Sequence, residues 1–403
     1  MPQAADSRGH APAPRMRVAF IGGGISSAVG RAHFHALQIE GLYRVVAGSF
    51  SRGVEGNLES AAAYGVAPER TYTDYHAMLA AERDNIDAVV VLTPTSMHAA
   101  PVIAALDAGV PVICEKALAT DLDELAAIDA ALARTGGFLA VTYNYTGYPA
   151  LREMRDMIRQ GRLGRILHFN AEMPQEGFIR RDPTGAPLRP QAWRLKDGAV
   201  PTVYLDLAVH LHQIAHYLLD KAPRSVSATQ RSFGNFDEIV DYVSANASYA
   251  DDVVGRFYFG KCMLGMRNGL RIQVFGSDAS ADWVQTNPEE LRVASANGTI
   301  QLIDRGAGTA VCHDARYTRF KAGHPAGFIE AFANLYVDIH AALLQYRRDG
   351  TWRSDEVFGL PLVSQGLTFL SAMARSARTA TMVTVPAAPH LHAENQHVHD
   401  ADR

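Results

Sequence analysis

Three side chains in this sequence have types and spacings suited to proton transfer at one substrate. Asp206 and His210 stand at positions i and i+4 of an apolar stretch, so both lie on one face if that stretch is helical. Lys116 is the last residue of a Cys-Glu-Lys sequence that follows a short apolar run. An unperturbed imidazole titrates near neutrality, which suits it to general acid–base catalysis. Asp206 and His210 are therefore candidate catalytic residues, whereas Lys116 taken alone could be a surface lysine on a loop.

A glycine-rich turn precedes the first predicted helix and could hold a phosphate group. Gly22 and Gly24 follow an apolar run, and Ser27 and Gly30 come shortly after them. Such a turn lets backbone amides approach a phosphate, and the N-terminus of the next helix adds positive potential. Ser27 stands where the GxGxxG pattern has its third glycine, and Gly30 fits that glycine displaced by three residues. The turn predicts that Gly22, Gly24, Ser27 and Gly30 bind a nucleotide.

The second predicted strand ends without the acidic residue that commonly binds the adenosine ribose of NAD. Its end reads Gly-Ser-Phe-Ser-Arg, and Ser51 and Arg52 could instead hold a ribose phosphate. The sequence thus leaves both NAD and NADP open as the cofactor and favours NADP slightly.

Apolar runs alternate with helical stretches through the first half of the chain. The predicted strands are 17–22, 43–50, 86–92, 110–114 and 138–143. The pattern predicts a doubly wound parallel sheet with helices on both faces, which is a Rossmann arrangement. Because the carboxyl ends of such strands face the ligand crevice, the segments after the third and fourth strands belong at the cofactor. These segments contain Thr93, Pro94, His98, Glu115 and Lys116.

After about residue 146 the pattern changes. The predicted helices are 149–160, 206–219, 325–347 and 357–376, and the predicted strands are 226–229, 242–249, 253–259, 270–275, 281–284 and 291–294. Short turns with Gly, Asp or Asn between strands are typical of an antiparallel sheet. We expect a nucleotide-binding domain at 16–145 and an α+β domain with a large, mostly antiparallel open sheet at 146–386. Disordered segments are expected at 1–15 and 387–403.

Four motifs, in this order, resemble those of the glucose–fructose oxidoreductase / inositol dehydrogenase family (Gfo/Idh/MocA). The matching residues are Gly30 and His33 for GxxH, Thr93, Pro94 and His98 for a TPxxxH-like segment, Glu115 and Lys116 for EKP, and Asp206 and His210 for a DxGxH-type helix. Ala117 replaces the proline of the third motif, and Ala208 replaces the glycine of the fourth. The resemblance covers about residues 16–386.

The resemblance implies hydride transfer between a nicotinamide and a hydroxyl or keto group of a sugar, cyclitol or sugar-acid derivative. It implies that Lys116 polarises the reacting oxygen, that His210 exchanges the hydroxyl proton, and that Asp206 orients His210 or the substrate. Tyr143 and Asn144 fit the segment that closes the nucleotide domain, and we expect them at the substrate and the cofactor. A cofactor-recycling lyase, hydrolase or epimerase, and a non-catalytic NAD(P)-sensing regulator, stay open as alternatives.

A long, arginine-rich stretch at 175–194 has two interpretations. It could be a solvated or subunit-contacting loop, or a lid that presents Trp193 and Arg194 to an anionic or sugar substrate. We place Trp193 and Arg194 among the substrate-binding residues. His210, His212 and His216 suggest a metal, but His210 and His212 point to different helix faces and a site needs further ligands, so we expect none.

Composition narrows the classes of partner. The chain has 403 residues, of which 48% are hydrophobic and 20% charged, enough for two globular domains. Its 38 basic and 42 acidic residues give a net charge of −4, which offers no case for nucleic acid or an anionic membrane. The cysteines, at positions 114, 262 and 312, form no CxxC pair, so we expect a reducing compartment, the cytoplasm. The resemblance implies a homodimer or homotetramer.

Overall fold

The computed structural model describes residues 15–308, 311–389 and 391. Its first sheet has five parallel strands in the order β2-β1-β3-β4-β5. The strands are β1 (Met16–Gly22), β2 (Tyr43–Ser49), β3 (Ala88–Leu92), β4 (Val112–Glu115) and β5 (Leu139–Thr142). Strand β3 is Ala-Val-Val-Val-Leu and is buried throughout, as a central parallel strand covered on both faces must be.

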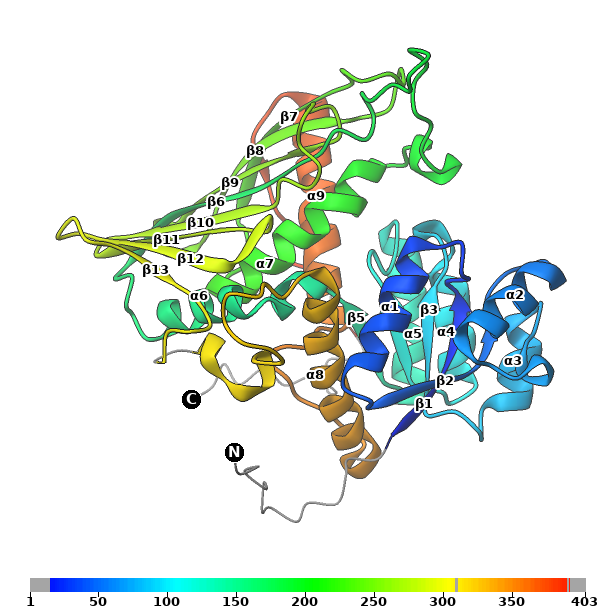
Figure 1. The fold of residues 1–403 in the computed structure, drawn as a ribbon. Helices are drawn as coiled ribbons and strands as arrows, with labels where there is room; N and C mark the ends of the chain where they lie inside the picture. Colours follow the sequence, from blue (N-terminus) through cyan, green and yellow to red (C-terminus); the bar gives the residue numbers. More distant parts are fainter. Residues whose placement is uncertain (1–14, 309–310, 390, 392–403) are drawn as a thin grey trace, which may run out of the picture.

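Helices cover both faces of this sheet (Figure 1). One face packs against α3 (Tyr75–Glu82), α4 (Ala99–Asp107) and α5 (Leu122–Thr135). The other packs against α1 (Ala28–Ile39), α2 (Val54–Tyr64) and α8 (Phe328–Asp349). Helix α8 comes from the second half of the chain, and the hydroxyl of Tyr43 donates to the carbonyl of Tyr336 on it at 2.8 Å. The late helix is therefore part of the first sheet's core.

The second sheet has nine strands in the order β13-β12-β11-β10-β6-β9-β8-β7-β14. They are β6 (Ile166–Pro174), β7 (Ser225–Arg231), β8 (Tyr242–Ser248), β9 (Val254–Gly260), β10 (Arg271–Gly276), β11 (Ala279–Val284), β12 (Asn287–Ser295), β13 (Ile300–Ile303) and β14 (Val383–Thr384). All neighbouring pairs are antiparallel except β6 and β9. The predicted fold class, a Rossmann sheet followed by a mostly antiparallel open sheet, is confirmed.

One face of the second sheet is covered by helices (Figure 1). These are α6 (Pro149–Arg159), α7 (Val209–Leu219) and α9 (Leu360–Thr379). The remaining short helices are η1 (Pro68–Arg70), η2 (Thr95–Met97), η3 (Asn144–Gly147), η4 (Ala192–Leu195), η6 (Ala250–Asp252), η7 (Val311–His313) and η8 (Ala315–Tyr317), with a π-helical turn, η5 (Tyr204–Ala208). Helix α7 and the η5 turn lie where the two sheets approach, which is where the candidate catalytic residues sit.

Several elements differ from the sequence prediction. The strands β6, β13 and β14 lie in stretches where no strand was predicted. The predicted helix 206–219 begins with the η5 turn, whose wider winding carries Asp206. The last helix begins at Leu360 rather than at 357, with Pro361 in its first turn. The predicted disordered segments 1–15 and 387–403 lie mostly outside the described residues. Within the described part of the chain, no helix is long and apolar enough to cross a membrane.

Candidate active site

Lys116 and Asp206 meet although 90 positions separate them in the chain. Lys116 follows the last residue of β4, at the carboxyl edge of the parallel sheet. Its Nζ donates to the backbone carbonyl of Asp206 at 3.0 Å and to Asp206 Oδ1 at 3.2 Å. The peptide bond between Lys116 and Ala117 is cis. The contact brings together two of the three predicted catalytic residues and joins the two sheets' domains at one point.

Three cations surround the Asp206 carboxylate. Besides Lys116, Lys261 lies with its Nζ 2.7 Å from Oδ2, and the Arg194 guanidinium also contacts Oδ2. Burial opposes ionisation of this carboxyl, but Lys116, Lys261 and Arg194 together hold its pKa well below the usual value. Asp206 is therefore a permanent anion, and it fixes the positions of three basic side chains.

His210 lies one helical turn after Asp206 and is buried, with 4% of its surface exposed. The Tyr145 ring meets it edge-on at 4.7 Å between centroids. Burial, with the Lys116 charge in second place, lowers the pKa of His210 to about 3. The expectation of titration near neutrality is wrong for this environment, and the imidazole is neutral at physiological pH. Its Nδ1 has no hydrogen-bond partner among the described residues.

Glu115 is held by its neighbours in the protein. Its Oε1 lies 3.0 Å from His33 Nε2 and accepts from the Thr142 hydroxyl at 2.5 Å. Burial would raise the pKa of Glu115, but the hydrogen bond and charge of His33, together with Lys116 and Thr142, lower it to about 2. His33 Nδ1 in turn lies 2.6 Å from the Tyr336 hydroxyl on α8. Glu115, predicted at the cofactor, therefore anchors the turn that carries Lys116.

His98 joins two turns at the edge of the parallel sheet. Its ring nitrogens lie 2.7 Å from the carbonyl oxygens of Ala117 and Thr93, and the side chain is buried. Thr93 also donates its hydroxyl to the carbonyl of Met97 at 3.0 Å. His98 thus fixes the turn after β3 against the turn after β4. This places Thr93 and Pro94 at the predicted edge, while the ring of His98 is engaged by backbone groups.

The glycine-rich turn has the shape that a dinucleotide requires. Gly22 and Gly23 have φ values of 77° and 69°, which favour glycine, and a Cβ on Gly30 would lie 2.0 Å from the Gly23 carbonyl oxygen. Ser27 caps α1 by accepting from the amide of Gly30 at 3.1 Å. Gly24 lies between Gly23 and Ser27, and a Cβ on Gly24 would lie 2.9 Å from Ser60 Oγ. The turn and the helix N-terminus together fit a pyrophosphate.

The end of β2 contains no carboxylate, as the sequence indicated. The Ser51 hydroxyl accepts from the amide of Gly53 at 3.2 Å, and the Ser51 amide donates to Asn57 at 3.0 Å. Arg52 is exposed beside them. These contacts shape a turn next to the glycine-rich turn, and Glu55 follows Arg52 by three residues in the first turn of α2.

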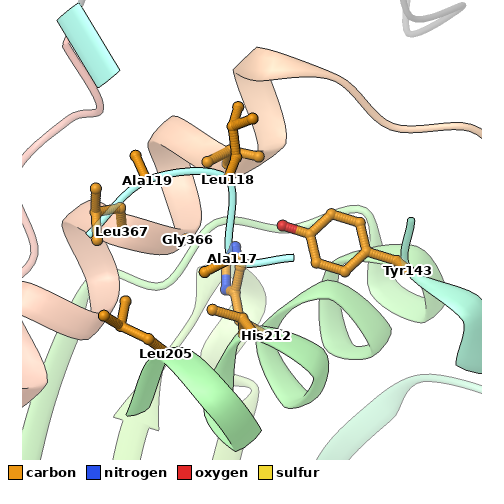
Figure 2. Close-up of a pocket in the computed structure, with 10 residues that line it drawn as sticks. Ala117, Leu118, Ala119, Tyr143, Leu205, His212, Gly366 and Leu367 are labelled. Carbon is orange, nitrogen blue, oxygen red and sulfur yellow. The ribbon is translucent and has the colours of Figure 1, made fainter. Parts of the chain in front are cut away.

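Asn144 and Tyr143 lie just after β5, at the same edge. Both are buried, and Asn144 Nδ2 has no hydrogen-bond partner among the described residues, which leaves a donor for a ligand. The Tyr143 ring meets His210 edge-on at 6.4 Å. Figure 2 shows the Tyr143 hydroxyl and the His212 ring at a small cavity beneath Ala117. This cavity has room for about one water molecule. None of the candidate catalytic residues lines it, and in this form it is too small for a sugar.

The arginine-rich stretch reaches the site through Arg194. Trp193 and Arg194 lie in η4, and the Arg194 guanidinium stacks 4.3 Å from the Trp193 ring centroid. Trp193 Nε1 donates to Gln191 at 2.9 Å. The contact of Arg194 with Asp206 agrees with the interpretation of this stretch as part of the site. Sequence reasoning missed Lys261, although its position directly after strand β9 was a usable signal.

The sequence raised the question of a metal at His210, His212 and His216. Within the residues that the structure describes, no group of three or more His, Cys, Asp or Glu side chains is placed to hold a metal ion. His212 packs against Phe369, with 5.6 Å between ring centroids. It also lines the cavity of Figure 2, and its ring is buried.

A Rossmann sheet with a glycine-rich turn after its first strand, and a contact of Lys116 with Asp206 close to His210, are features of a nucleotide-dependent oxidoreductase. Comparison with known proteins agrees. The profile of an oxidoreductase family with an NAD-binding Rossmann fold matches residues 16–143, and that of the GFO/IDH/MocA C-terminal domain matches residues 151–282. The chain belongs to the Gfo/Idh/MocA family, as its motifs indicated.

Individual relatives extend the similarity over most of the chain. An uncharacterized oxidoreductase, YfiI, of Bacillus subtilis is 31% identical over 85% of this chain and 87% of its own. Levoglucosan dehydrogenase of Pseudarthrobacter phenanthrenivorans is 27% identical over 57% of this chain and 63% of its own. The crystal structure of an Azotobacter vinelandii inositol dehydrogenase homologue with NADH and myo-inositol has a TM-score of 0.83 at 26% identity, covering 92% of this chain and 98% of that one.

Proposed function

We propose that this NAD(P)-dependent dehydrogenase interconverts a hydroxyl and a keto group on a sugar, cyclitol or sugar-acid derivative. The observation that carries the proposal is the junction of Lys116 and Asp206, with His210 one helical turn further on. Family relatives that act on levoglucosan and on inositols support the substrate class. A bound nicotinamide supplies the hydride acceptor or donor.

The chain's own residues would hold the cofactor at the edge of the parallel sheet. The turn at Gly22–Gly24 and the capped N-terminus of α1 would hold the pyrophosphate, and Ser51 and Arg52 would face the adenosine ribose. Asn144, whose buried amide lacks a protein partner, would donate to the nicotinamide end. His98 and Glu115 would act as positioning residues, because protein groups already engage them.

Lys116 and His210 would have separate roles at the reacting hydroxyl. The Lys116 ammonium would donate to the substrate oxygen and stabilise the alkoxide character that develops there. His210 would accept the hydroxyl proton as general base in oxidation and return it in reduction. Burial makes it a weak base in the ligand-free site, so this role requires that the negative charge developing on the substrate oxygen raise the pKa of the imidazole. Asp206 would keep the Lys116 ammonium in place through its backbone and side-chain oxygens. We place Tyr143 and Trp193 at the substrate, as the sequence predicted.

We further propose a homodimer or homotetramer that forms through the uncovered face of the nine-stranded sheet. One face of this sheet carries α6, α7 and α9, whereas the other carries no helix in the described part of the chain (Figure 1). The three free cysteines support a reducing, cytoplasmic location, and the net charge supports a small molecule rather than nucleic acid as partner. We keep 16–145 and 146–386 as the two domains.

The test is a panel of sugars and cyclitols, with NAD and NADP supplied separately and nicotinamide absorbance followed with time. Net reduction of the cofactor that is proportional to keto product is the expected result. Product that forms without net reduction would instead indicate a cofactor-recycling lyase, hydrolase or epimerase. Tight cofactor binding with no turnover on the whole panel would indicate a regulator and would overturn the proposal.

A further inference from the structure

The cations around Asp206 outnumber the carboxylates they can pair with. Lys116, Lys261 and Arg194 come from three separate segments and all contact this one carboxylate. In the described part of the chain, none of the three forms an ion pair with any other carboxylate. Glu115, the next acid along the turn, is held by His33 and Thr142. Glu115 nevertheless interacts with Lys116, whose charge helps to lower the pKa of that carboxyl. The three cations therefore face two carboxylates, and the cluster has one positive charge in excess.

Apart from Asp206 and the other two cations, the side-chain contacts of Lys261 and Arg194 among the described residues are with neutral groups. Lys261 Nζ donates to the Gln175 side chain at 3.2 Å and lies 5.5 Å from the Phe178 ring centroid. Arg194 stacks on Trp193. The side chain of Lys261 is only 10% exposed, and burial lowers its pKa, although Asp206 opposes the shift. A buried cation that shares its only counter-ion is costly unless another anion arrives.

The reaction proposed above does not remove this excess. The hydroxyl proton goes to His210, so the negative charge that develops on the substrate oxygen is matched by a positive imidazolium and the total charge of the site is unchanged. A single negative charge elsewhere on the substrate completes the balance: three cations against Asp206, Glu115 and one substrate anion. The Arg194 side chain is 24% exposed, so a ligand can reach this part of the cluster.

We propose that the substrate is an acidic sugar whose carboxylate is bound by Lys261 and Arg194. This inference rests on the proposed function and narrows its substrate class. The guanidinium fork of Arg194 matches the two oxygens of a carboxylate, and Lys261 adds a point charge from the deeper side. Trp193, under Arg194, offers an aromatic face to the sugar ring. Lys261 and Arg194 are thus specificity residues that the family motifs do not include.

The test compares matched pairs of sugars on the full-length protein with its cofactor. The pairs are D-glucose with D-glucuronate and D-galactose with D-galacturonate, and D-glucose 6-phosphate serves as the phosphate arm. We expect kcat/KM to be at least about 10-fold higher for the uronate in a pair. Loss of one hydrogen bond to a charged group, in Lys261→Met or Arg194→Gln, should lower the uronate value about 10- to 100-fold. The value for the neutral sugar should change much less.

Lys221→Met is the matched control, because Lys221 pairs with exposed Asp251 on the surface. Calorimetric titration of D-glucuronate and D-glucose into the protein with NADH gives a readout that does not depend on turnover. The inference would be overturned if the two sugars of a pair had equal kcat/KM and equal affinity, or if the phosphate ester were preferred to the uronate. It would also be overturned if the preference for the uronate were unchanged in both variants. If no sugar is turned over but uronate binding depends on Lys261, the proposed reaction fails and the carboxylate site stands.

Discussion

Replacement of Lys116 by methionine should slow the chemical step and leave cofactor binding intact. The change removes an ammonium that makes two contacts with Asp206, at 3.0 and 3.2 Å, and keeps most of the apolar stem. Loss of one preorganised donor at a developing oxyanion typically costs about 10²–10³ in rate, or about 3–4 kcal/mol in activation free energy. The fold should persist, because Asp206 keeps its contacts with Lys261 and Arg194.

The assay is single-turnover hydride transfer, followed by stopped-flow nicotinamide absorbance with the best substrate of the panel. Fluorescence titration with NADH and a melting curve show that the variant is folded and binds cofactor. Lys116→Arg keeps the charge but displaces it, so it should recover only part of the rate, whereas the control Lys221→Met should match the unmodified protein. A hydride-transfer rate within about twofold of the original in Lys116→Met would refute a role for this ammonium at the reacting oxygen, since one preorganised donor is worth far more.

Three further perturbations have defined outcomes. Gly30→Ala places a Cβ 2.0 Å from the Gly23 carbonyl oxygen. The free energy of unfolding, measured with denaturant, should decrease by about 1–3 kcal/mol, and NADH should bind more weakly. Unchanged stability and unchanged NADH affinity would contradict this close approach. Arg52→Asp should weaken NADP much more than NAD in parallel titrations, and equal changes would remove Arg52 from cofactor selection. His210 and His212 have folded pKa values of about 3 against 6.5 unfolded, so the unfolded state binds more protons between these values. The free energy of unfolding should therefore decrease as the pH is lowered from about 6.5, by up to about 1.4 kcal/mol per pH unit for each histidine. His212→Gln should reduce this slope, measured by urea titrations at several pH values.

The parallel sheet was predictable because its strands are continuous apolar runs. Strand β3, for example, is buried at every position, so composition alone marks it. Strand β6 was missed because it alternates: Phe169, Ala171 and Met173 are buried, while polar residues occupy the positions between them. A search for apolar runs overlooks a period of two, although that period is the expected signal for a sheet with one covered face.

The placement of Asp206 and His210 on one helix face was predictable from spacing, but the protonation state of His210 was not. Positions i and i+4 place Asp206 and His210 on one helix face wherever the helix lies. The low pKa of His210 arises from burial against Tyr145 and from the charge of Lys116, both of which lie far away in the sequence. No local pattern contains this information, since it depends on how the two domains meet.

The charge cluster shows why the reaction is easier to predict than the substrate. Lys116 and His210 belong to motifs, and motifs can be found in a sequence. Lys261 and Arg194 lie after a strand and within a long loop, and each looks like an ordinary basic residue until the fold brings both to Asp206. The excess of positive charge exists only as a sum over these segments. On the proposed roles, hydride transfer depends on the motif residues and charge preference on Lys261 and Arg194, so changes at Lys261 and Arg194 should redirect the enzyme among substrates while hydride transfer itself continues.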